Sequence, residues 1–181
     1  MMTDADWDRA AIAVVLRGLG HVPWPWRYSW DRHRTAKLGI RTRLCTLDPQ
    51  GDRSAAEQLA EGVLADFEQP CLLELLTGAA SNTVAVNAWT TEGEAWIYMN
   101  LPETPMILEG TPSGTVLFYR HPGKLVESRH VFVDGPTEPA IIRIFGEWGS
   151  VAVPPSAHEA ILAWPAVSAL PEFDPAWMGR R

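Results

Sequence analysis

The stretch Cys71-Leu-Leu-Glu-Leu-Leu-Thr-Gly-Ala-Ala-Ser-Asn-Thr-Val-Ala-Val-Asn-Ala-Trp89 decides the fold of this chain. It contains two short apolar runs, Cys71 to Leu76 and Thr83 to Ala88. Thr77 to Asn82 lies between them and is rich in small and turn-forming residues. Short apolar runs bounded by turn signals are typical of fully buried strands. We therefore predict two buried strands joined by a turn.

The chain that follows Trp89 predicts one short helix and a series of strands. Thr91 to Leu101 is expected to be helical, with Thr91 as its N-cap and Glu94 three residues later. Gly, Pro, Ser and Asp then separate short apolar runs, which is typical of strands joined by turns. Five further strands are predicted: Met106 to Leu108, Val116 to Tyr119, Val131 to Val133, Ile141 to Phe145 and Val151 to Val153.

The chain before Cys71 predicts two helices and an extended segment. Asp4 to Leu19 carries apolar residues at helical spacing, and two glycines end it. His21 to Trp26 is punctuated by prolines and is expected to be extended. Ser54 to Phe67 begins with a capping box and continues with an apolar stripe. This order of elements indicates an α+β fold, with a mixed or antiparallel central sheet flanked by helices.

The length of 181 residues fits a single domain. Within it we expect a helical and strand part over about 1–70, a sheet core over about 71–156 and an irregular tail over 157–181. No run approaches ~20 consecutive apolar residues, and no basic region precedes an apolar one at the N-terminus. We therefore expect a cytoplasmic protein without a membrane partner. The two cysteines, Cys45 and Cys71, do not provide a disulfide framework or a zinc site.

The charge of the chain is unevenly distributed. The net charge of −7 argues against strong, non-specific binding to nucleic acid. However, residues 26–43 hold six of the 15 lysines and arginines, interleaved with tryptophan and tyrosine. These six are Arg27, Arg32, Arg34, Lys37, Arg41 and Arg43. The segment is either a surface that follows phosphates, with aromatic stacking platforms, or a solvated loop whose arginines pair with the many acids of the chain.

Four segments, in order and at sensible spacing, resemble one known family. They are Ala10 to Pro23, Phe67 to Ser81, Thr111-Pro-Ser-Gly114 with the strand after it, and Gly149-Ser-Val-Ala-Val-Pro-Pro-Ser156 with His158. The last segment is the most specific. Together they resemble the bifunctional DNA primase/polymerase (prim-pol) N-terminal domain family of the archaeo-eukaryotic primase superfamily. This resemblance implies that Thr83 to Ala88 is a central strand and that Val116 to Tyr119 and Ile141 to Phe145 lie in the same sheet.

The resemblance also implies a two-metal mechanism of nucleotide transfer. Two carboxylates spaced i, i+2 lie on one face of a strand and hold divalent cations. A histidine on the neighbouring hairpin contacts the incoming triphosphate, and a further acidic residue lies on a later strand. In this chain the carboxylate positions hold Asn87 and Trp89, the histidine position holds Val116, and the late acidic position falls near Arg143. The resemblance therefore indicates a degenerate member without catalytic residues, bound metal or cofactor.

Several residues are candidates for binding a nucleotide or nucleic acid. They are the six basic residues above together with Ser113, Gly114, Arg120, Arg143, Ser156 and His158. Ser113 and Gly114 suit either an anion-binding turn or a plain hairpin turn. Ser156 and His158 suit either the edge of a site or a capping serine and a surface histidine. Trp89 either offers a stacking face or packs against Val116 and closes the expected cleft.

Three functions remain open at the level of sequence. The leading one is an inactive prim-pol-like domain that binds single-stranded nucleic acid or a nucleotide weakly, as an accessory of DNA replication or of a mobile element, with a replication protein as a further partner. The first alternative is an active primase or polymerase with displaced metal ligands, for which Glu92 and Glu94 have the required spacing. The second is a protein-interaction module that has lost nucleic-acid binding.

Overall fold

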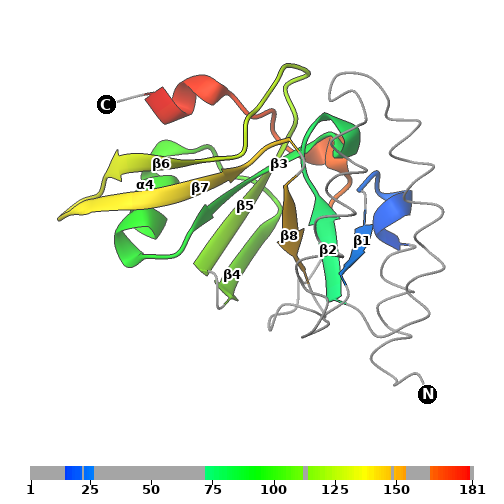
Figure 1. Cartoon of the computed structure of the whole chain (residues 1–181), viewed down its shortest axis with the longest axis horizontal. Helices are drawn as coiled ribbons and strands as arrows, with labels where there is room; N and C mark the ends of the chain where they lie inside the picture. The colour runs from blue at the N-terminus through cyan, green and yellow to red at the C-terminus, as the bar shows by residue number, and fades with distance from the viewer. Residues whose placement is uncertain are drawn as a thin grey trace, which may run out of the picture.

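The computed structural model describes residues 15–21, 23–26, 72–111, 114–147, 149–153 and 164–179. These residues form two antiparallel sheets, the ten-residue helix α4, a helical turn at residues 15–18 and short turns of 3-10 helix (Figure 1). The helical turn falls within the helix predicted over Asp4 to Leu19, whose first residues lie outside the described ranges. This arrangement confirms the α+β class. The predicted helix over Ser54 to Phe67 and the basic segment from Arg27 to Arg43 lie outside the described residues. The division of the chain into three parts stays a prediction.

The larger sheet has five strands in the order β4-β5-β3-β7-β6. Their bounds are β4 (Ile107–Thr111), β5 (Gly114–Arg120), β3 (Thr83–Ala88), β7 (Pro139–Phe145) and β6 (Arg129–Asp134). All four pairings are antiparallel. The central place of β3, with β5 and β7 beside it, confirms the expectation drawn from the family resemblance. All six residues of β3 are buried, which explains its continuous apolar run.

The smaller sheet has three strands in the order β1-β2-β8. In it β2 (Leu72–Leu76) pairs antiparallel with β1 (Pro23–Trp26) and with β8 (Ser150–Ala152). The prolines of β1 are tolerated because an edge strand need not donate every backbone N–H group. Both apolar runs of the deciding stretch are strands, as predicted. The turn between them, which contains η2 (Ala79–Ser81), carries the chain from one sheet to the other.

Helix α4 (Thr91–Asn100) follows β3 and begins one residue earlier than its predicted cap implies. The N-cap is Thr90, not Thr91, because Thr90 has extended backbone angles and its side chain accepts the N–H group of Gly93 at 3.1 Å. Glu94 instead accepts a hydrogen bond from the hydroxyl of Thr115 on β5, at 2.9 Å.

Across the described ranges, no helix combines the length and the apolar character that crossing a membrane requires.

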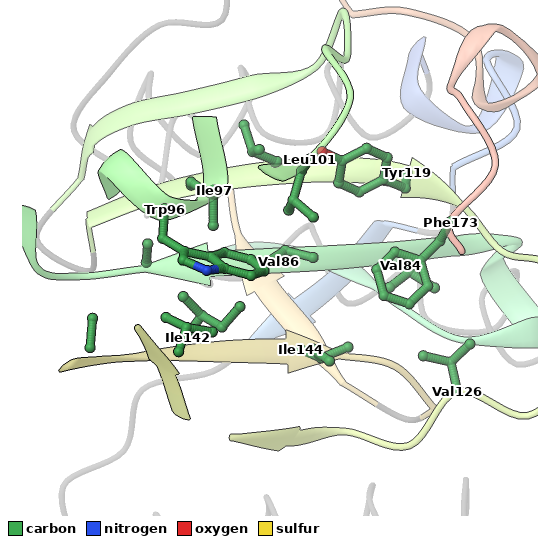
Figure 2. Packing of buried hydrophobic residues seen from close by; sticks show 14 residues of the cluster. Val84, Val86, Trp96, Ile97, Leu101, Tyr119, Val126, Ile142, Ile144 and Phe173 are labelled. Atoms are coloured by element: carbon green, nitrogen blue, oxygen red, sulfur yellow. The ribbon is translucent and has the colours of Figure 1, made fainter. Parts of the chain in front are cut away.

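The larger sheet separates two hydrophobic clusters. Side chains at even positions of β3 and β7 and at odd positions of β5 and β6 point toward α4 and the C-terminal segment. Figure 2 shows this first cluster, in which Trp96 and Ile97 of α4 lie over Val86 and Ile142. Alternate positions of β3, β4 and β5 point to the other face and join a second cluster. This second cluster includes Leu73 and Val151 of the smaller sheet, so the smaller sheet covers part of that face.

The C-terminal segment is fixed to β5 by backbone hydrogen bonds and by aromatic packing. The N–H group of Arg120 donates to Pro171 at 2.8 Å, and the N–H group of Phe173 donates to Arg120 at 2.9 Å. The rings of Tyr119, Phe173 and Trp177 contact one another with centroids 5.4 to 6.0 Å apart. Two 3-10 turns, η3 (Val167–Ala169) and η4 (Pro175–Gly179), lie in this segment. Val167, Leu170 and Phe173 of this segment are buried in the core.

A buried histidine and a largely buried glutamate hold the turn between the two sheets. Nε2 of His121, at the end of β5, lies 2.9 Å from Oε1 of Glu147, and their side chains are 2% and 10% exposed. The other oxygen of Glu147 accepts the N–H group of Ala79 at 3.0 Å. Gly78 permits this close approach, because a Cβ atom there would lie 2.6 Å from Oε2 of Glu147. The pair thus joins three segments that are distant in the sequence.

Candidate functional site

A row of side chains crosses the larger sheet in register. Asn87 of β3 lies opposite Val116 of β5 on one side and opposite Arg143 of β7 on the other. Arg143 in turn lies opposite His130 of β6. Directly opposed residues of antiparallel strands point to the same face, so the four side chains share the face that the smaller sheet partly covers. Three of the four positions that the resemblance marks as catalytic, Val116, Asn87 and Arg143, therefore lie side by side.

Asn87 lies in the buried half of this row. Its side chain is 4% exposed, and its amide nitrogen donates to the carbonyl oxygen of Thr115 at 3.1 Å. Val116, opposite to it, is also buried and packs in the cluster between the two sheets. Asn87 thus acts as a hydrogen-bonded core residue next to an apolar neighbour.

Trp89, the fourth marked position, follows the last residue of β3 and is 41% exposed. The edge of its ring meets the ring of His130, with centroids 5.8 Å apart and planes at 86°. Val116 is buried and belongs to the cluster between the sheets. The ring of Trp89 thus contacts β6, on the exposed part of the face.

Arg143 is exposed and places its guanidinium group over the ring of Phe145, 4.2 Å from the ring centroid. This cation–π contact orients the group along the strand. Within the described ranges no carboxylate pairs with Arg143. Its positive charge is therefore available on the surface beside His130 and Trp89.

Gly114 opens β5 and lies next to Trp89. Its φ angle is +84°, and a Cβ atom there would lie 2.0 Å from the carbonyl oxygen of Ala88 and 2.5 Å from Cα of Trp89. The start of β5 packs so closely against the end of β3 that only a glycine fits at position 114. The backbone of Gly114 thus supports the position of Trp89.

Arg120 lies at the other end of β5 from Gly114, opposite Thr83. It forms an exposed ion pair with Glu172 at 3.2 Å. The structure therefore does not bring Arg120 together with Arg143. The remaining candidates lie outside the described residues: Arg27, Arg32, Arg34, Lys37, Arg41, Arg43, Ser113, Ser156 and His158.

The residues of this row do not fit a divalent cation. Such cations require several oxygen ligands, usually carboxylates. This row offers an amide that is already hydrogen-bonded, an isopropyl group, a guanidinium and the single imidazole of His130, with the indole of Trp89 beside it. Glu92 and Glu94 belong to α4, which packs on the opposite face. Glu92 accepts the N–H and hydroxyl groups of Thr137 at 3.1 and 2.6 Å. No group of three or more His, Cys, Asp or Glu in the described ranges could hold a metal ion.

Two further residues, which no sequence motif marks, complete this surface: His130 and Phe132. Both belong to β6 and point to the same face as Arg143, since His130 is opposite Arg143 and Phe132 is opposite Ile141. Phe132 is 78% exposed. The signal was present in the alternation Arg129-His-Val-Phe-Val-Asp134, in which Val131 and Val133 pack toward the core and the residues between them do not.

Comparison with known proteins gives one match. The model of the family described as bifunctional DNA primase/polymerase, N-terminal, matches residues 5–177. The match spans both sheets and α4 and reaches into the C-terminal segment. Searches of curated proteins and of solved structures return nothing similar to this chain.

Proposed function

This chain belongs to the bifunctional DNA primase/polymerase N-terminal domain family, and we propose that it is a member without polymerase activity. In this proposal it binds single-stranded nucleic acid or a nucleotide weakly and without a metal. It then serves as an accessory of DNA replication or of a mobile element.

The register of three neighbouring strands carries this proposal. Val116, Asn87 and Arg143 stand opposite one another, where the family resemblance places a histidine and two carboxylates. Two-metal phosphoryl transfer needs anionic ligands that hold both cations against the reacting oxygens. An arginine in the row repels a cation, and a buried valine has no donor atom for a triphosphate.

The same substitutions leave a surface that suits phosphate. The guanidinium of Arg143 is exposed, and arginine binds phosphate oxygens in a bidentate manner. The indole of Trp89 is partly exposed beside it and offers a face on which a base can stack. The net charge of −7 keeps such binding weak and sensitive to salt.

Primer extension tests the loss of catalysis. The purified protein is incubated with a primed template, deoxynucleoside triphosphates and either magnesium or manganese, and we expect no product above a blank without protein. Metal-dependent extension that disappears in a Glu92→Gln, Glu94→Gln double variant would establish displaced ligands and overturn the proposal. Extension that persists in that variant and in Asn87→Ala would point to a contaminating polymerase.

Binding at low salt tests the remaining activity. We expect single-stranded DNA, RNA or a nucleotide to bind with an affinity that falls steeply as salt is added. Replacement of Arg32, Arg34 and Lys37 by alanine together is expected to abolish this binding if the basic segment follows the phosphates.

A second candidate function is a protein-interaction module that keeps the fold without nucleic-acid binding. The acidic net charge favours it, because nucleic acid is repelled at long range. Absence of binding to any of the three ligands at low salt would make this second function the better one.

A further inference from the structure

The exposed half of the larger sheet carries a strip of aromatic and basic side chains, Trp89, His130, Phe132 and Arg143. Figure 1 shows β6 and β7 extending away from β1 and β2. Leu73 and Val151 of the smaller sheet pack in one cluster with side chains of β4 and β5, so the smaller sheet covers that side of the face. The strip lies on the β7 and β6 side. Within the described chain β6 is an edge strand of the sheet.

Phe132 has no packing role that explains it. At 78% exposure it is the most exposed of the large apolar residues in the described ranges. On the other face of the same strand, Val133 is buried in the core and Val131 packs against it. A single exposed apolar residue is ordinary. Here, however, the exposed ring shares its face with the indole of Trp89 and the imidazole of His130, which contact each other.

The register fixes how these groups are spaced. Phe132 and His130 are two residues apart on β6, so their side chains emerge on the same face about 7 Å apart. Arg143 stands directly opposite His130. The strip therefore presents three rings with a guanidinium group at its edge, since the guanidinium of Arg143 lies over Phe145, on the side of Arg143 away from Phe132. Asp134 ends β6 on the same face, so we expect phosphates on the Arg143 side of Phe132.

Exposed rings on an antiparallel sheet face, with a cation beside them, match the chemistry of unpaired nucleic acid. Bases stack on exposed aromatic side chains, and arginine contacts the phosphates. A duplex does not offer its base faces to a flat sheet, so the ligand is single-stranded. We infer that Trp89, His130, Phe132 and Arg143 form a base-stacking platform for single-stranded nucleic acid. This inference deepens the proposed function and rests on it.

A comparison of variants at Phe132 tests the platform. A short fluorescein-labelled oligodeoxythymidylate is titrated at low salt with the wild-type protein and with Phe132→Ala, Phe132→Leu and Phe132→Tyr, and the anisotropy is followed. We expect Phe132→Ala and Phe132→Leu to weaken binding at least about fivefold, because both lose the ring. Phe132→Tyr keeps the ring and should bind within about twofold of the wild type.

The matched control is Met99→Ala. Met99 is 65% exposed and apolar, and it belongs to α4 on the opposite face of the sheet, so its replacement should leave affinity unchanged. A thermal melt of each variant separates loss of the platform from loss of the fold. Tryptophan fluorescence gives a second readout, since the part of the quenching that disappears in Trp89→Phe reports a base on Trp89.

The outcomes of these experiments distinguish a failure of the platform from a failure of the proposed function. If the wild type binds and Phe132→Leu binds equally well, the platform is wrong, whereas the proposed function stands and the ligand lies elsewhere. If the wild type binds no single-stranded nucleic acid, both fail. If the wild type instead forms a dimer that Phe132→Ala dissociates, the strip is an interface between copies of the chain, and the platform is also wrong.

Discussion

Asn87 lies directly opposite Arg143 in the antiparallel pair of β3 and β7. The two positions differ sharply in environment, because Asn87 is buried and hydrogen-bonded to Thr115 whereas Arg143 is exposed. The row thus passes from core to surface within one strand spacing. Packing therefore constrains Asn87, while Arg143 is free to contact a ligand.

The first prediction concerns Asn87→Asp, a change that restores one carboxylate. It removes the N–H donor that Asn87 gives to Thr115 and sets a carboxylate oxygen against that carbonyl oxygen. We expect a loss of about 1–3 kcal/mol in the free energy of unfolding at neutral pH. Urea denaturation measures it. The control is Arg143→Gln at an exposed position, which loses the cation–π contact with Phe145 and should cost less than about 1 kcal/mol.

The second prediction concerns Glu147, whose two carboxylate oxygens both accept hydrogen bonds. Oε1 accepts from His121 and Oε2 accepts from Ala79. Glu147→Gln retains only one acceptor oxygen, so we expect a loss of about 1–3 kcal/mol. The control is Glu172→Gln, which breaks the exposed pair with Arg120 and should cost less than about 1 kcal/mol. Equal losses of stability in the two variants would contradict the role of Glu147 in joining His121 and Ala79 by hydrogen bonds.

The third prediction compares two glycines in the left-handed region. The φ angle is +84° at Gly114 and +72° at Gly123. At Gly123 a Cβ atom would meet nothing within 4 Å, whereas at Gly114 it would lie 2.0 Å from the carbonyl oxygen of Ala88. Gly123→Ala should therefore cost only the backbone strain of about 1–2 kcal/mol. Gly114→Ala should cost clearly more, and it should change the fluorescence of Trp89.

The fourth prediction concerns the pH dependence that His21 confers. Burial lowers the pKa of His21 below its ordinary value, although the hydrogen bond with the carbonyl oxygen of Pro165 opposes this effect. The buried Nδ1 atom has no partner among the described residues, so a proton there would be poorly solvated. The unfolded chain therefore binds a proton at a higher pH than the folded chain, and stability falls as the pH drops below about 6.5.

Thermal unfolding at about pH 7.5 and about pH 5.5 measures this effect. His21→Gln keeps a donor for Pro165 and has no titrating ring, so its melting temperature should fall less on acidification than that of the wild type. An equal fall in both proteins would assign the pH dependence to other groups.

Much of the fold follows from the sequence, because burial on both faces leaves a strong signal. Thr83 to Ala88 reads as a continuous apolar run because all six residues are buried. The division into two sheets does not follow, since an apolar run specifies burial but not a partner strand. The pairing of Leu72–Leu76 with strands from both ends of the chain is fixed only by tertiary packing.

The candidate site was only partly predictable. Asn87, Val116 and Arg143 were placed by their motif context, and the register joins them. The sequence does not mark Phe132 as exposed, because a phenylalanine between two valines is typical of a core strand. Only the alternation of inward and outward side chains along β6 shows that Phe132 lies on the face opposite to Val131 and Val133. The sequence gives no reason to separate Arg120 from Arg143, yet Arg120 stands opposite Thr83 at the start of β3 and Arg143 stands opposite Asn87 near its end.

The smaller sheet has a consequence for the order in which the protein folds. Its middle strand β2 pairs on one side with β1 and on the other with β8, whose residues follow the whole larger sheet in the chain. Closing so long a loop costs more entropy than the local hairpins of the larger sheet. During synthesis on the ribosome, one edge of β2 therefore waits for Ser150–Ala152 to emerge. A nascent chain that stalls before this point leaves a leucine-rich edge open to aggregation.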